Sequence, residues 1–478
     1  MPPPETPAAP GGPALRGDLT QGPLVRTLLI FALPQLLGNV LQSLNGSINA
    51  VWVGRLLGEE ALAATANANI VMFLLFALTF GFGMAATVRI GQTFGARDID
   101  GARRAYGTSL ALTAIIALTV SVAGWIGAPW LLDALATPDP SRSDALTYLR
   151  VILLGVPAMM ISLQLAMGLR GSGDSRSPLN VMILSSLIDV ALNPVLILGL
   201  GPAPQMGISG AATATLIAST VGMLAQVGQL YWRDLPLRLR GTELRYLVPR
   251  MEELRFLVSK GVPMGAQMLV ISGAGVVMIG LVNREGLDTA AAYGALLQVW
   301  NYIGMPAMAI GAAVSAMIAQ HIGAMREDRV DAISIAGCGA NLLMTGALIA
   351  LLLPFDGPVL QLFLGPGSAA MREAIHIQDL AIWTYLPFGV TIVLFGALRA
   401  YGVLYAQLLI LLVSMYGVRL GAYYLLYPVI GSDALWYSYL LSSVTSVLMT
   451  MGIYAFGNWR KAMRARIAAR EVANAVIA

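Results

Sequence analysis

The chain has 478 residues and a formal net charge of +4, and 57% of its residues are hydrophobic while only 11% are charged. Soluble domains carry about 25% charged residues, so this composition excludes an ordinary soluble fold for most of the chain. It also excludes a nucleic-acid-binding module, which needs a basic face on a soluble domain. The single cysteine, Cys338, excludes an internal disulfide framework.

The first 23 residues are rich in proline, glycine and alanine. Such a segment has too little apolar surface to order itself, so residues 1–23 are expected to form a disordered cytoplasmic tail. The apolar run from Leu24 past Val53 is too long for the core of a signal peptide, and it predicts an uncleaved membrane span.

A helix needs about 20 mostly apolar residues to cross a bilayer. Twelve segments of the chain satisfy this requirement. In the first half they are residues 25–53, 61–88, 105–128, 147–169, 179–200 and 207–232. In the second half they are residues 256–282, 289–320, 331–353, 378–398, 404–427 and 435–457. The predicted fold is therefore an all-α integral membrane protein with twelve transmembrane helices.

The distribution of lysine and arginine orients these helices, because basic loops are retained in the cytoplasm. If both termini are cytoplasmic, most of the 29 basic residues fall on the cytoplasmic side. They gather after the second span, in the polar linker 233–255 and in the basic tail 458–478. We therefore expect both termini to face the cytoplasm and the protein to lie in the inner, or plasma, membrane.

The two halves of the chain resemble each other at a spacing of about 228 residues. The segment "GFGMAATVRIGQTFGA" (81–96) aligns with "AIGAAVSAMIAQHIGA" (309–324), which pairs Gln92 with Gln320. One residue further apart, "GLRGSG" (168–173) aligns with "ALRAYG" (397–402). Each half contains an even number of spans, so the six-helix lobes 24–232 and 256–457 are parallel repeats. In such transporters the substrate site lies at the interface between repeats near the membrane midplane.

Several stretches resemble the multidrug and toxic compound extrusion (MATE) family. "ALPQLLGNVLQSLNGSINAVWVGRLLGEEALAA" is similar to its first span and loop, and "LRGSGDSRSPLN", "LIDVALNPVLI" and "MGISGAATAT" follow in the order of its fourth to sixth spans. "MPAMAIGAAVSAMIAQHIGA" resembles its eighth span. The resemblance covers residues 24 to 457. It implies two lobes around a V-shaped central cleft, and the export of organic, often cationic, compounds in exchange for protons or sodium.

Asp189 lies about halfway along the fifth predicted span. A carboxylate there is costly in a bilayer and normally faces the bundle interior or a wet cavity. Desolvation favours its neutral form, so Asp189 is the candidate carrier of a coupling proton, and the resemblance implies the same role. Asn49 stands where many family members carry an aspartate. An amide cannot carry a proton but can donate and accept hydrogen bonds, so Asn49 is expected either to hold Asp189 or to have no function.

Other polar residues in the spans are candidates for hydrogen bonding to Asp189 or for lining a cavity. Gln42 stands where the family often has a cavity-lining glutamine. Helix-to-helix hydrogen bonds are expected for Gln35 and Asn39. The remaining candidates in the first lobe are Asn45, Ser185, Thr213 and Thr215, and those in the second lobe are Gln267, Gln298, Asn301 and Tyr302.

The second lobe lacks the acids that sodium-coupled members of the family carry in their seventh and tenth spans. Their absence makes sodium coupling less favoured, because a hard cation favours several oxygen ligands with charge among them. Sodium coupling is kept as an alternative to proton coupling. Arg419, in the eleventh span, is expected to play a structural role, by pairing with a backbone carbonyl or by snorkelling. A flippase for lipid-linked precursors is a further alternative, which requires basic residues in the cavity.

No nucleotide-binding, metal-binding or nucleophile motif is present in a suitable context, so an enzyme is not expected. The sequence predicts a monomeric antiporter that exports organic, cationic or amphipathic compounds and is driven by proton influx through Asp189. Its expected partners are a small organic substrate and the lipid bilayer, with no nucleic acid or nucleotide. No cofactor is expected beyond the proton gradient, or sodium in the alternative.

Overall fold

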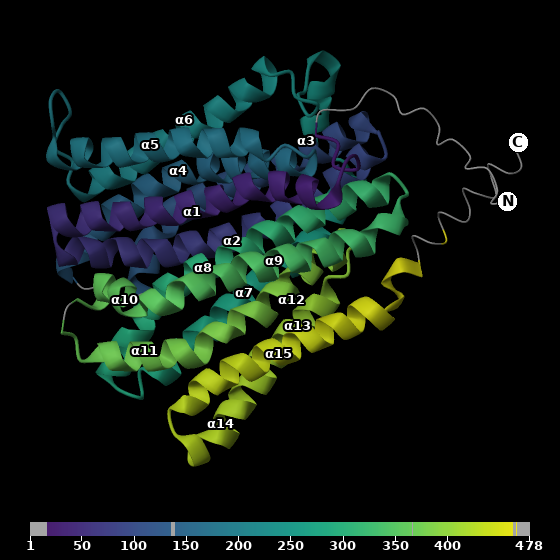
Figure 1. Ribbon diagram of the computed structural model, residues 1–478. Helices are drawn as coiled ribbons and strands as arrows, with labels where there is room; N and C mark the ends of the chain where they lie inside the picture. The colour runs from purple at the N-terminus through teal and green to yellow at the C-terminus, as the bar shows by residue number, and fades with distance from the viewer. Residues whose placement is uncertain (1–16, 135–138, 366, 462–464, 466–478) are drawn as a thin grey trace, which may run out of the picture.

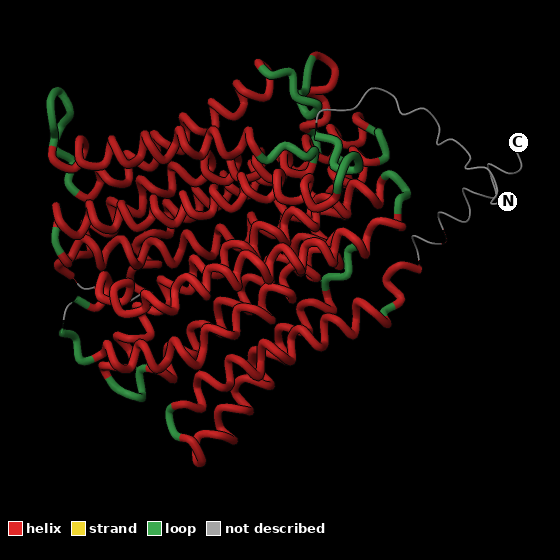
Figure 2. The backbone as a smooth tube through the Cα atoms, viewed as in Figure 1, coloured by secondary structure: helices red, strands yellow, loops and turns green. Residues whose placement is uncertain are grey.

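The computed structural model describes residues 17–134, 139–365, 367–461 and 465, and within these ranges the chain is helical and contains no β-strand (Figures 1 and 2). The six long helices of the first half are α1 (Leu24–Leu57), α2 (Glu59–Gly95), α3 (Ile99–Ala134), α4 (Asp139–Gly171), α5 (Arg176–Leu198) and α6 (Ile208–Trp232).

The second half contains more helical pieces because several of its spans are interrupted. Its helices are α7 (Met251–Val282), α8 (Leu287–Gly323), α9 (Val330–Leu352), α10 (Asp356–Leu364), α11 (Ala370–Ala381), α12 (Tyr385–Ala400), α13 (Tyr405–Leu412), α14 (Arg419–Ile430) and α15 (Asp433–Phe456). Short 3₁₀ turns join α9 to α10 and α11 to α12, and a π-helix at Val413–Val418 joins α13 to α14.

Eleven of the described helical segments are long and apolar enough to cross a membrane. The 37-residue α2, which packs along α4, α7 and α8, completes the twelve predicted spans. Figure 1 shows α1 to α6 gathered on one side of the molecule and α7 to α15 on the other. The two lobes predicted from the internal repeat are therefore visible as two helix bundles.

The segments between and before the lobes are more ordered than the sequence suggested. In the predicted linker, a 3₁₀ turn at Gly241–Leu247 packs on α3, and α7 begins at Met251, inside the predicted linker. The early start follows from an ion pair: Glu253 is buried and both its oxygens accept bonds from Arg89, at 2.8 and 2.9 Å. The negative charge of Glu253, which is one reason that residues 233–255 resemble a linker, is thus neutralised by Arg89 inside the bundle.

Residues 17–23 correct the prediction of a fully disordered tail. Leu19 and Thr20 are buried, and the Leu19 N–H donates to Oε1 of Gln320 at 2.8 Å. The chain between Gly17 and α1 thus closes over the end of α8. The remainder of the predicted tail, residues 1–16, lies outside the described residues, as does most of the basic tail beyond Lys461.

Several close backbone contacts between the lobes lie at the end of the bundle that carries the 3₁₀ turn Gly241–Leu247 and the first turns of α1 and α7, which we call the linker end (Figure 1). A Cβ atom on Gly95 would overlap the backbone carbonyl of Gln320, and one on Gly323 would overlap the carbonyl of Gln92. Farther from the linker end, Gly81 of α2 lies against the backbone of Gly261 and Gly265 of α7. Small residues let membrane helices approach this closely, and α2 therefore serves as the seam between the lobes.

Candidate functional site

Asp189 is 3% exposed and lies at the centre of a polar cluster formed by α1, α5 and α6. Its Oδ2 accepts hydrogen bonds from Nδ2 of Asn45 at 2.8 Å and from Nδ2 of Asn49 at 2.7 Å. Its Oδ1 accepts from Oγ1 of Thr215 at 3.1 Å and from Nδ2 of Asn193 at 3.3 Å. Four side chains thus donate to one carboxylate, and none of them is charged.

Two amide oxygens of this cluster have no hydrogen-bond partner although they are buried. They are Oδ1 of Asn45 and Oδ1 of Asn193. The Oδ1 atom of Asn49, in contrast, accepts a bond from Nδ2 of Asn193 at 3.0 Å. A buried acceptor without a donor is costly, so the cluster contains two acceptors that a proton-bearing group could satisfy.

The structure places the other predicted partners of Asp189 differently. Ser185 packs against Gly222 of α6, one turn away from the carboxylate, and makes no described bond to it. The hydroxyl of Thr213 donates to the carbonyl of Ser209 in its own helix at 2.7 Å. Asn193 was absent from the sequence-based candidates. Its signal is its position four residues after Asp189, on the same face of α5.

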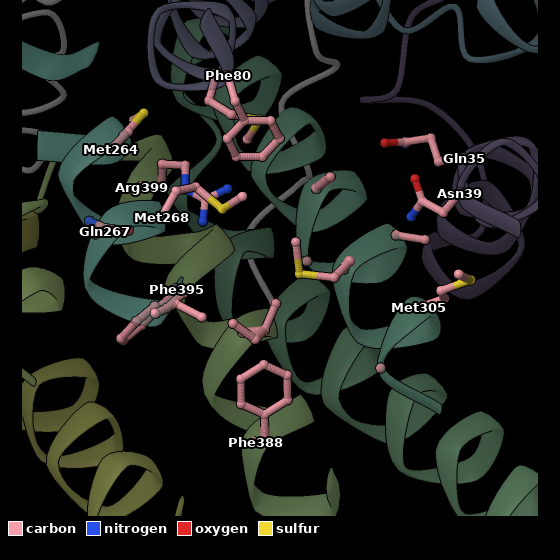
Figure 3. Close-up of a pocket in the computed structure, with 18 of the residues that line it drawn as sticks. Gln35, Asn39, Phe80, Met264, Gln267, Met268, Met305, Phe388, Phe395 and Arg399 are labelled. Atoms are coloured by element: carbon pink, nitrogen blue, oxygen red, sulfur yellow. The ribbon is translucent and has the colours of Figure 1, made fainter. Parts of the chain in front are cut away.

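A second feature is a central cavity of about 570 Å³ between the two lobes. Its walls come from α1, α2 and α4 of the first lobe and from α7, α8, α12 and α13 of the second. Figure 3 shows Gln35 and Asn39 on the wall opposite Met264, Gln267 and Arg399. This volume falls within the range of about 300–1,000 Å³ that is typical of sites for drug-sized ligands.

Most of the cavity wall is apolar and built from flexible or aromatic side chains. The methionines and phenylalanines of the wall are Met84, Met167, Met264, Met268, Met305, Met308, Phe76, Phe80, Phe388 and Phe395. Methionine is unbranched and polarisable, so such a surface adapts to ligands of different shape.

The neutral polar candidates divide between the cavity and other locations. Gln42, Gln267 and Asn301 line the cavity, and Nδ2 of Asn301 donates to Oγ of the lining residue Ser43 at 3.1 Å. Gln298 and Tyr302 are not among the residues that line it.

Gln35 and Asn39, for which helix-to-helix hydrogen bonds were expected, also line the cavity. Asp189 does not line the cavity. The helix that connects the two features is α1, since Asn45 and Asn49 contact Asp189 while Gln42 and Ser43 reach the cavity.

Arg419 is 7% exposed and is held by neighbours within its own lobe. Its Nε donates to Oγ of Ser442 at 3.0 Å, and its guanidinium carbon lies 4.1 Å from the centre of the Tyr439 ring. A hydroxyl and an aromatic face therefore take the place of the carbonyl or the snorkelling expected from the sequence. Arg419 occupies the place in the second lobe that Asp189 occupies in the first. The repeat spacing of 229 residues in this part of the chain relates Asp189 to position 418, and the π-helix Val413–Val418 adds one residue, which shifts the match to Arg419.

Comparison with known proteins supports the two-lobed architecture. A model of the MatE family matches residues 34–195 and, a second time, residues 263–425. The two matches cover more than half of the chain, once in each lobe. The chain belongs to the MATE family.

Among relatives of this MATE protein, the probable multidrug resistance protein YoeA of Bacillus subtilis is 33% identical over 92% of the chain and 96% of its own length. A protein named FAD transporter from Shewanella oneidensis is 26% identical over 81% of the chain and 84% of its own length. A solved outward-facing structure of a multidrug resistance MATE family transporter matches with a TM-score of 0.85 at 21% identity. It covers 96% of this chain and 99% of the solved one.

Two charged residues of the cavity were not among the candidates from the sequence. Arg170 and Arg399 lie one residue beyond the predicted spans 147–169 and 378–398. Instead they stand at the last turns of α4 and α12 and line the central cavity. Their signal in the sequence was the repeat itself, since both lie at the same place in the matched segments 168–173 and 397–402.

Proposed function

We propose that this MATE protein is a secondary active antiporter that exports amphipathic organic compounds and is driven by proton influx through Asp189. The observation that carries the proposal is the environment of Asp189. It is a buried carboxylate in a membrane span that is bonded to neutral donors from α1, α5 and α6. Among the described residues, no cation forms an ion pair with it.

Protonation of this carboxylate has a direct mechanical consequence for α1. A protonated Asp189 donates one hydrogen bond and needs an acceptor, whereas Asn45 and Asn49 both present Nδ2 to it. The buried, unpartnered Oδ1 of Asn45 becomes that acceptor if the amide turns over or α1 shifts. Because the next turns of α1 line the cavity, the protonation state of Asp189 is passed to the substrate site.

Other buried acids serve as a contrast. Glu253 is neutralised by Arg89. Asp356 of α10 accepts a bond from Nε2 of Gln378 at 3.2 Å, within the second lobe and away from the seam between the lobes. Neither carboxylate connects to α1, and we assign neither a role in coupling.

Sodium as the driving ion is less well supported by this geometry. A sodium site needs oxygen ligands around the ion, with negative charge among them. Asp189 supplies one carboxylate, and the four side chains that contact it do so through N–H and O–H donors. The relatives' names span multidrug resistance and FAD, so the names alone do not fix the substrate class.

The test uses inverted membrane vesicles that contain the wild-type chain, D189N or D356N. Uptake of ethidium and of 1-pyrenebutyrate is measured under an imposed pH gradient, with and without sodium. We expect uptake of at least one probe to be driven by the pH gradient without sodium, to be lost in D189N and to persist in D356N. Proton-driven uptake that is undiminished in D189N, or uptake that requires a sodium gradient, overturns the proposal.

A further inference from the structure

Two arginines from opposite lobes line the same cavity. Arg170 stands at the last turn of α4 and Arg399 at the last turn of α12, at equivalent places in the two repeats. Figure 3 shows Arg399 on the cavity wall, on the same side as Met264, Gln267 and Met268. A ligand that contacts both arginines therefore touches both lobes at once.

Within the described part of the chain, neither guanidinium group has an acidic partner. The Nε atoms of Arg170 and Arg399 are buried and have no hydrogen-bond partner. Arg170 makes a weak contact from Nη1 to the sulfur of Met167 at 3.9 Å. Among the described residues, no carboxylate lies within ion-pair distance of either arginine. Both groups remain charged because arginine is not deprotonated in proteins.

Other arginines inside the bundle are treated differently. Arg89 is paired with Glu253, and Arg419 is held by Ser442 and by the ring of Tyr439. Burying an unpaired charge is costly, and proteins normally avoid it. The two cavity arginines are thus available for a partner that the described part of the chain does not supply.

The remainder of the cavity wall does not offset their charge. The residues that line it are apolar or neutral, with no aspartate or glutamate among those described. Lys260 does not line this cavity but lines a small neighbouring pocket together with Arg399, and it donates to the carbonyl of Gly402 at 3.0 Å. Asp189 is outside the cavity and is already bonded to four donors. In a low-dielectric cavity such an uncompensated positive potential repels a cation and attracts an anion.

We propose that the cavity binds amphipathic organic acids, whose carboxylate or phosphate is taken by Arg170 and Arg399 and whose apolar body lies against the methionines and phenylalanines. Arginine forms charge-assisted hydrogen bonds that match both of these anions. This inference refines the substrate class of the proposed antiporter and rests on that function for its biological meaning. The volume of about 570 Å³ suits a compact acid of drug size.

The test compares three probes with one aromatic body: 1-pyrenebutyrate, its uncharged amide 1-pyrenebutanamide, and the cation 1-pyrenebutylamine. Their dissociation constants are measured by fluorescence on the purified full-length chain in detergent at pH 7.5. We expect the acid to bind roughly tenfold or more tightly than the amide, as for one charge-assisted hydrogen bond. In R170Q and in R399Q this preference should fall toward one, while the affinity for the amide stays unchanged.

Two controls make the result specific. R176Q removes an exposed arginine that does not line the cavity and should keep the preference. R399K retains a positive charge and should retain part of the preference for the acid over the amide. Unchanged binding of the amide shows that each variant is folded. Equal binding of the three probes by the wild-type chain, tighter binding of the amine, or a preference that survives in the double variant R170Q/R399Q overturns the inference.

The outcome is separable from that of the proposed function. The binding preference is measured at equilibrium in detergent, so it needs neither a pH gradient nor transport. If the preference is present but no proton-driven uptake occurs, the acid site stands and the antiporter fails. If ethidium uptake is proton-driven and the acid is not preferred, the antiporter stands and the acid site fails.

Discussion

Gln92 and Gln320 make the same hydrogen bond in opposite directions across the seam between the lobes. Nε2 of Gln92 in the first lobe donates to the carbonyl of Ala400 in the second, at 2.9 Å. Nε2 of Gln320 in the second lobe donates to the carbonyl of Gly171 in the first, at 3.1 Å. Gly171 and Ala400 directly follow Arg170 and Arg399. The closure of the linker end is therefore built from two equivalent bonds beside the proposed acid site.

Removing either glutamine should favour opening of the linker end. We expect Q320A to have the larger effect, because this side chain also accepts from the Leu19 N–H and donates to Gly17. One net hydrogen bond contributes about 0.5–1.5 kcal/mol, so opening should increase by roughly two- to twelvefold per bond. The readout is the rate at which maleimide labels A319C in a C338A chain, since Ala319 is buried against Gly91.

The control for that labelling is Q407A. Nε2 of Gln407 donates to the carbonyl of Phe395 at 3.0 Å, but both residues belong to the second lobe. Its loss should lower stability without exposing position 319. Labelling that is equally fast in Q407A and Q320A would contradict a role of the seam.

A methyl group at Gly323 should hold the linker end apart. A Cβ there would overlap the backbone carbonyl of Gln92, which cannot rotate away. We expect G323A to lower the melting temperature in detergent and to speed labelling of A319C. Gly294 of the same helix has open space around its Cβ position, so G294A should not destabilise and should gain some of the roughly 1 kcal/mol by which alanine exceeds glycine in helices.

Replacing Asn49 by aspartate should shift the pH dependence of transport toward alkaline pH. Nδ2 of Asn49 lies 2.7 Å from Oδ2 of Asp189, so N49D places two carboxyl groups side by side. Like charges this close cannot both ionise easily, and the pair retains a shared proton to higher pH. The measurement is vesicle uptake as a function of pH, and S185A, away from the carboxylate, should leave the profile in place.

Arg419 should matter for stability and not for proton coupling. R419A removes the bond to Ser442 and the contact with the Tyr439 ring and leaves a void, for an expected loss of about 2–4 kcal/mol. R142A, which removes a surface pair with Asp133, should cost about 0–1 kcal/mol. Thermal unfolding measures both variants. Loss of proton-driven uptake in correctly folded R419A would argue against a purely structural role.

Much of the fold was predictable from the sequence because membrane spans are long apolar runs and the two halves repeat. The proximity of Asn49 to Asp189 was one of two alternatives that the sequence left open. Side-chain direction was harder to predict. Asn301 and Tyr302 are adjacent in the chain, yet only Asn301 lines the cavity, because the rotation of α8 about its axis depends on packing between lobes.

The ends of the spans were the other difficulty. The sequence assigns Glu253 to the linker and Arg170 to a loop, because charged residues are normally excluded from apolar membrane spans. Each belongs to a helix that continues past its apolar stretch, and only the tertiary structure supplies Arg89 for the first and the cavity for the second. The hydropathy averaged over a stretch of sequence does not reveal that Arg89 pairs with Glu253 or that Arg170 faces a cavity.

The two unpaired arginines in the cavity bear on the energy source of transport. If one monoanion leaves the cell for each proton that enters, two positive charges move inward in every cycle, whereas exchange of a monovalent cation for a proton moves none. Each charge that crosses 100 mV contributes about 2.3 kcal/mol. An interior-negative membrane potential would thus drive export by this chain at neutral external pH, where the chemical proton gradient alone is small.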